Sequence, residues 1–259
     1  MKIATWNVNS IRAREAQLTS FLEKHNPDVV CLQEIKCEES SFPRQILLDL
    51  GYHSAVSGQK TYNGVAILSR EKPEEVTIGM NKDVENFDDP QARVIAATIS
   101  GIRVVSAYVP NGQEPGCEKF NYKLSWLKAF REYLKQCLRK NDLVVAGGDY
   151  NIAPEDIDVH DPKKWQNKIL CTAEERLQFA SLLELGLVDT YRELYPDNQQ
   201  FSWWDYRAGN FQKNAGLRID FLLATPELFS LCDDCSISMT ERSGEKPSDH
   251  APVIAEFAV

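Results

Sequence analysis

The sequence predicts an α/β fold in which two similar half-sheets pack together. Short apolar runs bounded by Gly, Pro, Asn or Asp are typical of buried strands, and such runs occur in both halves of the chain. Longer stretches between them repeat apolar residues with helical spacing. No repeat of the sequence itself is detectable, so the similarity of the halves lies in the order of strands and of polar strand ends.

The predicted strands end or begin at polar side chains. Residues 2–6 lead into Asn7 and Asn9, and residues 28–32 lead into Gln33 and Glu34. Further strands are expected at residues 102–107 before Tyr108 and Asn111, 143–146 before Asp149 and Asn151, 221–224 after Asp220, and 251–257 after Asp249 and His250. Polar groups at strand ends of an α/β sheet line a common crevice. The side chains that we expect to lie together there are Asn7, Glu34, Tyr108, Asn111, Asp149, Asn151, Asp220, Asp249 and His250.

Apolar spacing predicts helices over residues 10–25, 116–140 and 172–186. The first should stop at Asn26 and Pro27, because proline cannot continue a helix. The third opens with Thr172 and Glu175, which have the spacing of a capping box. The apolar faces of these helices are expected to pack on the core and to frame the crevice.

Length and composition indicate one domain, residues 1–259, because such a chain can bury a large core and shows no Gly/Ser/Pro-rich linker. No apolar stretch approaches the roughly 20 residues of a membrane span, and the N-terminus is typical of a strand instead of a signal peptide. The seven cysteines, an odd number, indicate reduced thiols, and Cys232 and Cys235 lack the second pair of a zinc site. We therefore expect a cytoplasmic protein with no membrane partner.

The net charge of −9 argues against a general nucleic-acid-binding module. Carboxylates gathered at a metal site would contribute to this acidic total. A DNA-binding face would then need a local ring of basic side chains. The candidates for this ring are Lys36, Lys60, Arg93, Lys119, Lys123, Lys163, Lys164, Lys168, Arg207, Lys213 and Arg218.

The polar groups at the strand ends restrict the chemistry. Carboxylate and amide oxygens are ligands that Mg²⁺ or Mn²⁺ prefers, whereas zinc is disfavoured because His250 is the single histidine among them and no cysteine is near. The chain has neither a phosphate-binding GxxxxGK[ST] loop nor a GxSxG nucleophile elbow. A cation among carboxylates, with neutral donors beside it, fits the hydrolysis of a phosphate ester.

Longer strings of residues match a known pattern nearly end to end. They are residues 5–12 (TWNVNSIR), 31–36 (CLQEIK), 62–69 (YNGVAILS), 108–112 (YVPNG), 148–151 (GDYN), 201–207 (FSWWDYR), 216–220 (GLRID) and 248–250 (SDH). Because these strings occur in this order and spacing, the chain resembles the exonuclease III family of class II apurinic/apyrimidinic endonucleases. That family is part of the endonuclease/exonuclease/phosphatase superfamily. The resemblance implies a four-layered α/β sandwich, with two packed mixed β-sheets flanked by helices.

The resemblance also implies roles for single residues. Asp149 would be the general base that activates water, and His250, held by Asp220, would donate to a phosphate oxygen; Tyr108 and Asn151 would contact the phosphate. The metal ligands and their supports would be Asn7, Glu34, Asp149, Asn151, Asp249 and His250. DNA or substrate contacts would come from Asn111, Lys36, Arg93, Trp203, Arg207, Leu217 and Arg218. Trp203, Trp204 and Leu217 would wall a small pocket for a turned-out abasic sugar, and residues 154–171 would lie beside the lesion.

Plainer interpretations of the same residues stay open. Asn7 can cap the first helix, and Asn111, Asp149 and Asn151 can be turn residues. Tyr108, Trp203 and Trp204 can be packed aromatic side chains, and Asp220 can be an ion-pair partner of Arg218.

The function implied is a Mg²⁺-dependent phosphodiesterase of base-excision repair, in which Mn²⁺ can substitute. It would cleave double-stranded DNA 5′ to abasic sites, and it could also act as a 3′-phosphatase, 3′-phosphodiesterase and 3′→5′ exonuclease on blocked 3′ ends. The family implies a monomer. The alternatives are a specialised 3′-end-processing enzyme with little abasic incision, a phosphomonoesterase for lipid-like phosphates, and an idle nucleic-acid-binding module.

Overall fold

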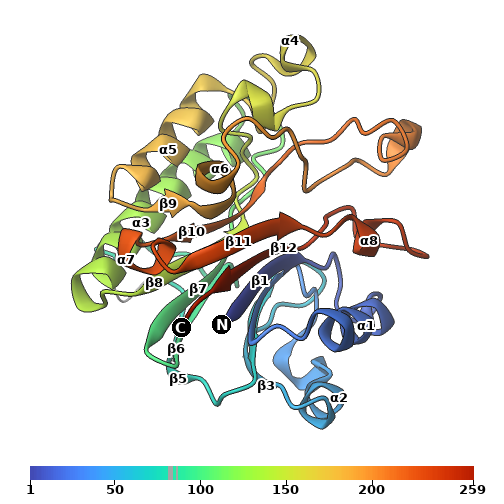
Figure 1. The fold of residues 1–259 in the computed structure, drawn as a ribbon. Helices are drawn as coiled ribbons and strands as arrows, with labels where there is room; N and C mark the ends of the chain where they lie inside the picture. Colours follow the sequence, from blue (N-terminus) through green and yellow to red (C-terminus); the bar gives the residue numbers. More distant parts are fainter. Residues whose placement is uncertain (81–83, 86) are drawn as a thin grey trace.

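The computed structural model describes residues 1–80, 84–85 and 87–259 and contains two six-stranded sheets packed face to face (Figure 1). In order across the first sheet lie β11 (Cys232–Ile237), β12 (Val253–Phe257), β1 (Lys2–Asn7), β2 (Val29–Gln33), β4 (Val65–Ser69) and β3 (His53–Ser57). In order across the second lie β5 (Glu74–Ile78), β6 (Val94–Ile99), β7 (Ile102–Tyr108), β8 (Val144–Asp149), β10 (Asp220–Ala224) and β9 (Val188–Asp189).

Both sheets are mixed and follow the same plan. The parallel pair β1–β2 occupies the centre of one sheet, and the parallel pair β7–β8 occupies the centre of the other. All other strand pairs in the described part of the chain are antiparallel. The predicted similarity of the two halves is therefore a similarity of sheet topology. It brings the carboxyl ends of four central strands to one edge of the sandwich.

Helices cover the outer faces of the sandwich (Figure 1). Helices α1 (Glu15–His25) and α2 (Arg44–Asp49) lie on the first sheet, and α3 (Glu118–Lys140) and α5 (Ala173–Leu183) lie on the second. The shorter helices are α4 (Pro162–Trp165), α6 (Thr190–Leu194), α7 (Pro226–Phe229) and α8 (Met239–Arg242), and three single turns of 3₁₀-helix span Glu39–Ser41, Asp156–Asp158 and Arg207–Gly209.

Three apolar layers hold the four structural layers together. Between the sheets, Ile3 and Val29 of the first sheet pack with Val104 and Leu222 of the second. The outer layers lie beneath α1 and α2 on one side and beneath α3 and α5 on the other. Because every central strand is covered on both faces, most of its residues are apolar, as the sequence indicates. The predicted four-layered α/β sandwich is confirmed.

Helix α1 begins later than residue 10, the start that the apolar spacing predicts. Asn9 and Ser10 have φ angles of 44° and 89°, which lie outside the range of a right-handed α-helix. The backbone N–H of Ser10 instead donates to the carbonyl oxygen of Glu34 at 2.7 Å, and Ile11 is buried. Residues 9–14 thus fold over the ends of β1 and β2 and help to close the crevice.

The other two predicted helices form as expected, and Thr172 and Glu175 make the predicted capping box of α5. All seven cysteines are free thiols, and both Cys232 and Cys235 lie on β11. Within the described residues, no helix has the length and apolar character that crossing a membrane requires.

Candidate active site

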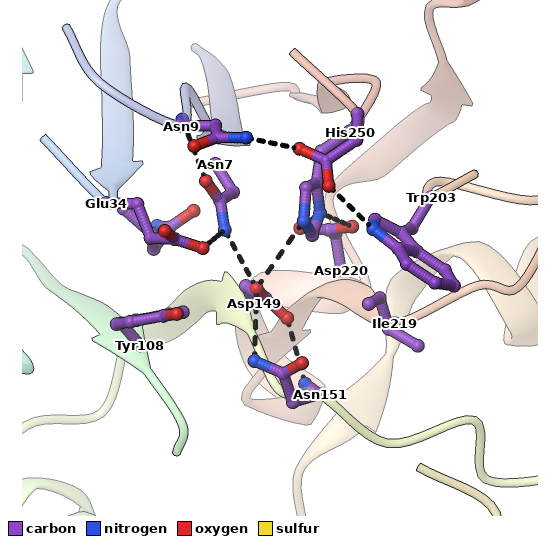
Figure 2. A network of polar contacts seen from close by, with 12 residues as sticks. Asn7, Asn9, Glu34, Tyr108, Asp149, Asn151, Trp203, Ile219, Asp220 and His250 are labelled. Atoms are coloured by element: carbon purple, nitrogen blue, oxygen red, sulfur yellow. Dashed lines mark hydrogen bonds and ion pairs between the residues drawn. The ribbon is translucent and has the colours of Figure 1, made fainter. Parts of the chain in front are cut away.

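The polar strand ends predicted to share a crevice do so (Figure 2). Asn7 ends β1, Glu34 follows β2, Tyr108 ends β7 and Asp149 ends β8, so each central strand delivers one polar side chain. Asp220 opens β10, where it is paired with Asp149 in the ladder, and His250 lies just before β12. Side chains far apart in the sequence therefore meet where the two sheets end.

Asp149 lies at the centre of this network and is almost fully buried. Its Oδ2 accepts hydrogen bonds from Nδ2 of Asn7 at 2.9 Å and from Nδ2 of Asn151 at 3.2 Å, and its Oδ1 accepts from the backbone N–H of Asn151 at 2.9 Å. Burial raises the pKa of the Asp149 carboxyl, and the charges of Asp220 and Glu34 add to this effect, while His250 and Asn7 oppose it. A carboxylate whose pKa is raised toward neutrality is suited to accept a proton from water.

His250 is held by Asp220. Its Nδ1 lies 2.9 Å from Oδ2 and 3.1 Å from Oδ1 of Asp220, and Nδ1 must be the donor because a carboxylate only accepts. Asp220 is fixed in turn by the hydroxyl of Ser202, which donates to Oδ2 at 2.6 Å. This leaves Nε2 of His250 facing the crevice, 3.8 Å from Oδ2 of Asp149.

The charge on His250 follows from these neighbours. Burial by itself lowers the pKa of the imidazole, but the carboxylates of Asp220, Asp149 and Asp249 outweigh burial and raise that pKa. The imidazolium form is therefore favoured, with an N–H directed into the crevice. The predicted Asp220–His250 pair is thus present, and the alternative pairing of Asp220 with Arg218 is wrong.

Glu34 and Asp249 stand on either side of Asn9. Glu34 accepts from Nδ2 of Asn7 at 2.8 Å and pairs with Nζ of Lys36 at 2.7 Å. Asp249 accepts from Nδ2 of Asn9 at 2.9 Å and from Nε1 of Trp203 at 3.0 Å. Burial raises the pKa of each carboxyl, but the nearby positive charges and these hydrogen bonds outweigh it, so both pKa values are lowered.

Glu34, Asp149 and His250 each place a potential ligand atom within 4.8 Å of the others. Because Nδ1 of His250 donates to Asp220 and the imidazolium carries a hydrogen on Nε2, a cation in this crevice would be held by the carboxylates of Glu34 and Asp149. The two carboxylates suit a hard divalent cation such as Mg²⁺. Asn7 supports them as a donor, since its Nδ2 bridges Glu34 and Asp149 while its Oδ1 accepts from the backbone of Asn9. Asp249, whose oxygens accept from Asn9 and Trp203, is not one of these three groups, and its role as a metal ligand stays a prediction.

Tyr108 and Asn111 complete the second-sheet side of the crevice. Burial raises the pKa of the Tyr108 hydroxyl well above its usual value, and the charges of Glu34 and Asp149 raise it further, so the hydroxyl stays a donor. Nδ2 of Asn111 donates to Oδ1 of Asn151 at 3.1 Å. A cavity of about 530 Å³ opens beside Tyr108 and Asn111, and Arg93 lines it.

The seven predicted DNA contacts divide into four groups. Lys36 and Asn111 point into the crevice network. Arg93 is mostly buried, with its guanidinium over the Tyr108 ring, and it donates to the carbonyl oxygen of Tyr108 at 3.3 Å. Arg207 is exposed and pairs with Asp205, and Trp203 is partly exposed beside His250, with which it shares a β-bridge.

The prediction that Arg218 contacts DNA is wrong. Its guanidinium is 1% exposed, and it forms ion pairs with Asp158 at 2.7 Å and Asp189 at 2.8 Å inside the protein. The side chain of Leu217 is also fully buried, in an apolar cluster with Leu170 and Ile219, so it offers no surface to a ligand in this structure.

Trp204 packs in the core, its plainer interpretation. It is fully buried between the sheet residues and Phe211, and its Nε1 donates to Oδ1 of Asn214 at 3.2 Å. Of the predicted pocket walls, only Trp203 has exposed surface.

Three further side chains fix the site and were missed by sequence reasoning. Asn9 links Lys36 to Asp249, Ser202 holds Asp220, and the hydroxyl of Ser248 donates to the carbonyl oxygen of Asn7 at 2.6 Å. Each lies one or two residues from a predicted site residue, so proximity in the sequence was the available signal. Asparagine and serine are common in turns and loops, so the residue types alone did not indicate a role in the site.

Comparison with known proteins agrees with this geometry. The sequence profile of the Endonuclease/Exonuclease/phosphatase family matches residues 4–250. The chain belongs to this family. Exodeoxyribonuclease III from Haemophilus influenzae is 39% identical, with 99% of this chain and 100% of the relative covered.

Two solved structures extend the comparison. A 3′ phosphatase from Neisseria bound to a product DNA hairpin is 44% identical, with a TM-score of 0.97 and 100% of both chains covered. An AP endonuclease from Archaeoglobus fulgidus is 41% identical, with a TM-score of 0.95 and 100% of both chains covered. The resemblance inferred from the motifs is confirmed, and the chain is a hydrolase of the nuclease type.

Proposed function

We propose that this protein is a Mg²⁺-dependent DNA repair phosphodiesterase that cleaves double-stranded DNA 5′ to abasic sites and removes blocking groups from 3′ ends. The observation that carries the proposal is the meeting of Glu34, Asp149 and His250 at the ends of the central strands. Two carboxylates and an imidazole, surrounded by amide donors, suit the hydrolysis of a phosphodiester. Mn²⁺ is expected to substitute for Mg²⁺, since both prefer oxygen ligands.

Glu34 and Asp149 would hold the cation, with Asn7 fixing the distance between the two carboxylates. Once bound, the cation would supply charge neutralisation at the phosphate and at the leaving oxygen. Lys36, which pairs with Glu34 at 2.7 Å, keeps that carboxylate ionised, because its positive charge lowers the pKa of Glu34 against the effect of burial.

The remaining groups would act directly on the reactants. Asp149 would accept a proton from the attacking water, while Asn151, whose amide donates to Asp149, orients that carboxylate. His250 would donate its Nε2 hydrogen to a phosphate oxygen, with Asp220 holding the ring. Tyr108 would add a second donor on the other side of the phosphate. Water would attack in line, with no covalent intermediate on the protein.

The substrate class is supported by what the relatives act on. An AP endonuclease and a 3′ phosphatase both share this fold over the whole chain at more than 40% identity. The specialised alternative, 3′-end processing with little abasic incision, is not favoured because the relatives include both kinds of enzyme. The phosphomonoesterase and the idle binding module fit less well, since the described site keeps a complete set of acid, base and donor groups beside Trp203.

We also propose that residues 1–259 act as a single domain and a monomer in the cytoplasm. One family profile spans nearly the whole chain, and one apolar layer joins both sheets. Seven free thiols are typical of a reducing compartment.

A paired cleavage assay tests the proposed function. One duplex carries an internal abasic-site analogue and the other a 3′-phosphate at a nick, and each is incubated with Mg²⁺ and with EDTA. We expect Mg²⁺-dependent incision of the first, leaving a 3′-hydroxyl, and release of phosphate from the second. Activity on the second duplex alone would favour the specialised 3′-end-processing enzyme, and cleavage that persists in EDTA would contradict the metal requirement.

A further inference from the structure

A lysine inside the protein touches the backbone of two residues of the site. Lys123 lies in α3, and its side chain is fully buried. Its Nζ donates to the carbonyl oxygen of Asn151 at 2.6 Å and to that of Asn111 at 3.1 Å, and it forms an ion pair with Glu175 of α5. Lysine is almost never fully buried unless it is paired, so this contact set is unusual and specific.

Glu175 extends the same network to the segment that leads into α5. Its Oε1 accepts from the backbone N–H of Leu170 at 3.1 Å, and its Oε2 accepts from the backbone N–H and the hydroxyl of Thr172. One buried ion pair therefore connects three segments: the turn after β7, the turn after β8, and the start of α5.

The turn after β7 lies directly on the stem of this lysine. Gly112 has a φ angle of +90°, and a Cβ atom added there would lie 3.0 Å from Cδ of Lys123. Such a contact is closer than ordinary packing, and the positive φ disfavours any side chain. Gly112 thus lets the backbone carrying Asn111 approach the lysine.

The side chains of the two held residues meet in the crevice. Nδ2 of Asn111 donates to Oδ1 of Asn151, and Nδ2 of Asn151 donates to Oδ2 of Asp149 at 3.2 Å and to the carbonyl oxygen of Val109. The amide of Asn151 can take this orientation only if its backbone stays where Lys123 holds it. A shift of either turn would change the donors presented to Asp149.

We propose that Lys123 is a positioning residue for the reaction, which acts through the backbone of Asn111 and Asn151 and is kept buried by Glu175. This inference rests on the proposed function of Asp149 and Asn151. Stability alone does not account for the pair, because replacing a buried ion pair by apolar residues of similar volume is often neutral or stabilising. What an apolar residue cannot provide is the set of donors to two carbonyl oxygens of the site.

The test uses the double variant Lys123→Met/Glu175→Gln, which removes the buried charges together and keeps the volume of both side chains. Single-turnover cleavage of the abasic duplex with Mg²⁺ gives the rate, and fluorescence anisotropy in EDTA gives the affinity for the uncleaved duplex. We expect the rate to fall about 30-fold and the DNA affinity to change less than about three-fold, because misplaced donors at Asp149 affect the chemical step. Glu175→Gln alone keeps the lysine donors and should lose less than about five-fold.

Leu134→Ala is the matched control for lost stability, since Leu134 is buried in the same helix about three turns after Lys123 and makes no hydrogen bond to Asn111 or Asn151 through its apolar side chain. All rates are compared well below each melting temperature. An equal loss of rate in Leu134→Ala and the double variant, or a wild-type rate in the double variant, would overturn the inference. If the double variant has no cooperative unfolding transition, Gly112→Ala replaces it, and an unchanged rate there would overturn the inference as well.

The wild-type protein in the same assay separates this inference from the proposed function. Absence of cleavage by the wild type would overturn the proposed function and, with it, the role of Lys123. Normal cleavage by the wild type together with normal cleavage by the double variant would overturn the role of Lys123 alone.

Discussion

Asp149→Asn should lower the single-turnover rate on an abasic duplex by about 10⁴-fold, the upper range for loss of a general base. Asn has the same shape as Asp but cannot accept a proton from water. The single oxygen of the asparagine can still accept from the side chains of Asn7 and Asn151, while its NH2 group loses the hydrogen bond from the backbone N–H of Asn151. The side-chain shape is unchanged and a buried charge is removed, so the fold should be retained.

The matched control for this result is Asp142→Asn, which changes an exposed aspartate just before the same strand, β8. It should cleave at the wild-type rate. Both variants should bind the uncleaved duplex in EDTA. A well-folded Asp149→Asn protein with full activity would refute the assignment of Asp149 as the base.

The second large effect is expected for His250→Asn, with a loss of about 10³-fold, as for removal of a charged donor at the reacting oxygen. Asparagine is shorter than histidine and cannot place a positively charged N–H where Nε2 lies. Asp220→Asn should lose less, about 30-fold, because the ring stays in place while its charge and orientation are less well fixed.

The pair of variants distinguishes a direct role from a supporting one. The double variant Asp220→Asn/His250→Asn should be no slower than His250→Asn alone, since Asp220 acts through the imidazole. Rates that multiply in the double variant would mean that Asp220 contributes separately. Circular dichroism spectra and melting temperatures should accompany the rates, because His250 is buried and its replacement leaves unfilled space.

The strand ends were predictable from the sequence because the apolar run of a strand and its polar end are neighbours in the chain. The same pattern recurs from one central strand to the next. A strand such as β8 is apolar on both faces and stops abruptly at Gly148, Asp149 and Asn151, so its polar end stands out. The topology then places those ends together, since the parallel central strands of both sheets end at the same edge of the sandwich. For this reason Asn7, Glu34, Tyr108 and Asp149 were found together.

The wrong predictions concern residues whose position is set by contacts with segments distant in the sequence. Arg218 has the sequence context of a strand-end cation, but Asp158 and Asp189, which neutralise it, come from distant segments and leave no trace near it in the chain. Similarly, apolar spacing extended the first helix back to Ser10, whereas a hydrogen bond to Glu34 draws that residue over the strand ends. Lys123 was counted among the candidates for a basic DNA-binding ring because lysine is usually a surface residue, whereas the structure buries it fully, so that prediction is wrong.

A metal titration tests the central claim most directly, namely that the crevice formed by Glu34, Asp149 and His250 is a metal-dependent active site. The cleavage rate of the abasic duplex is measured against Mg²⁺ concentration for the wild type, Glu34→Gln and the exposed control Glu227→Gln. The account predicts that Glu34→Gln raises the half-saturating Mg²⁺ concentration at least about ten-fold, with the melting temperature little changed, while the control matches the wild type. A Glu34→Gln protein with the wild-type Mg²⁺ dependence would contradict it.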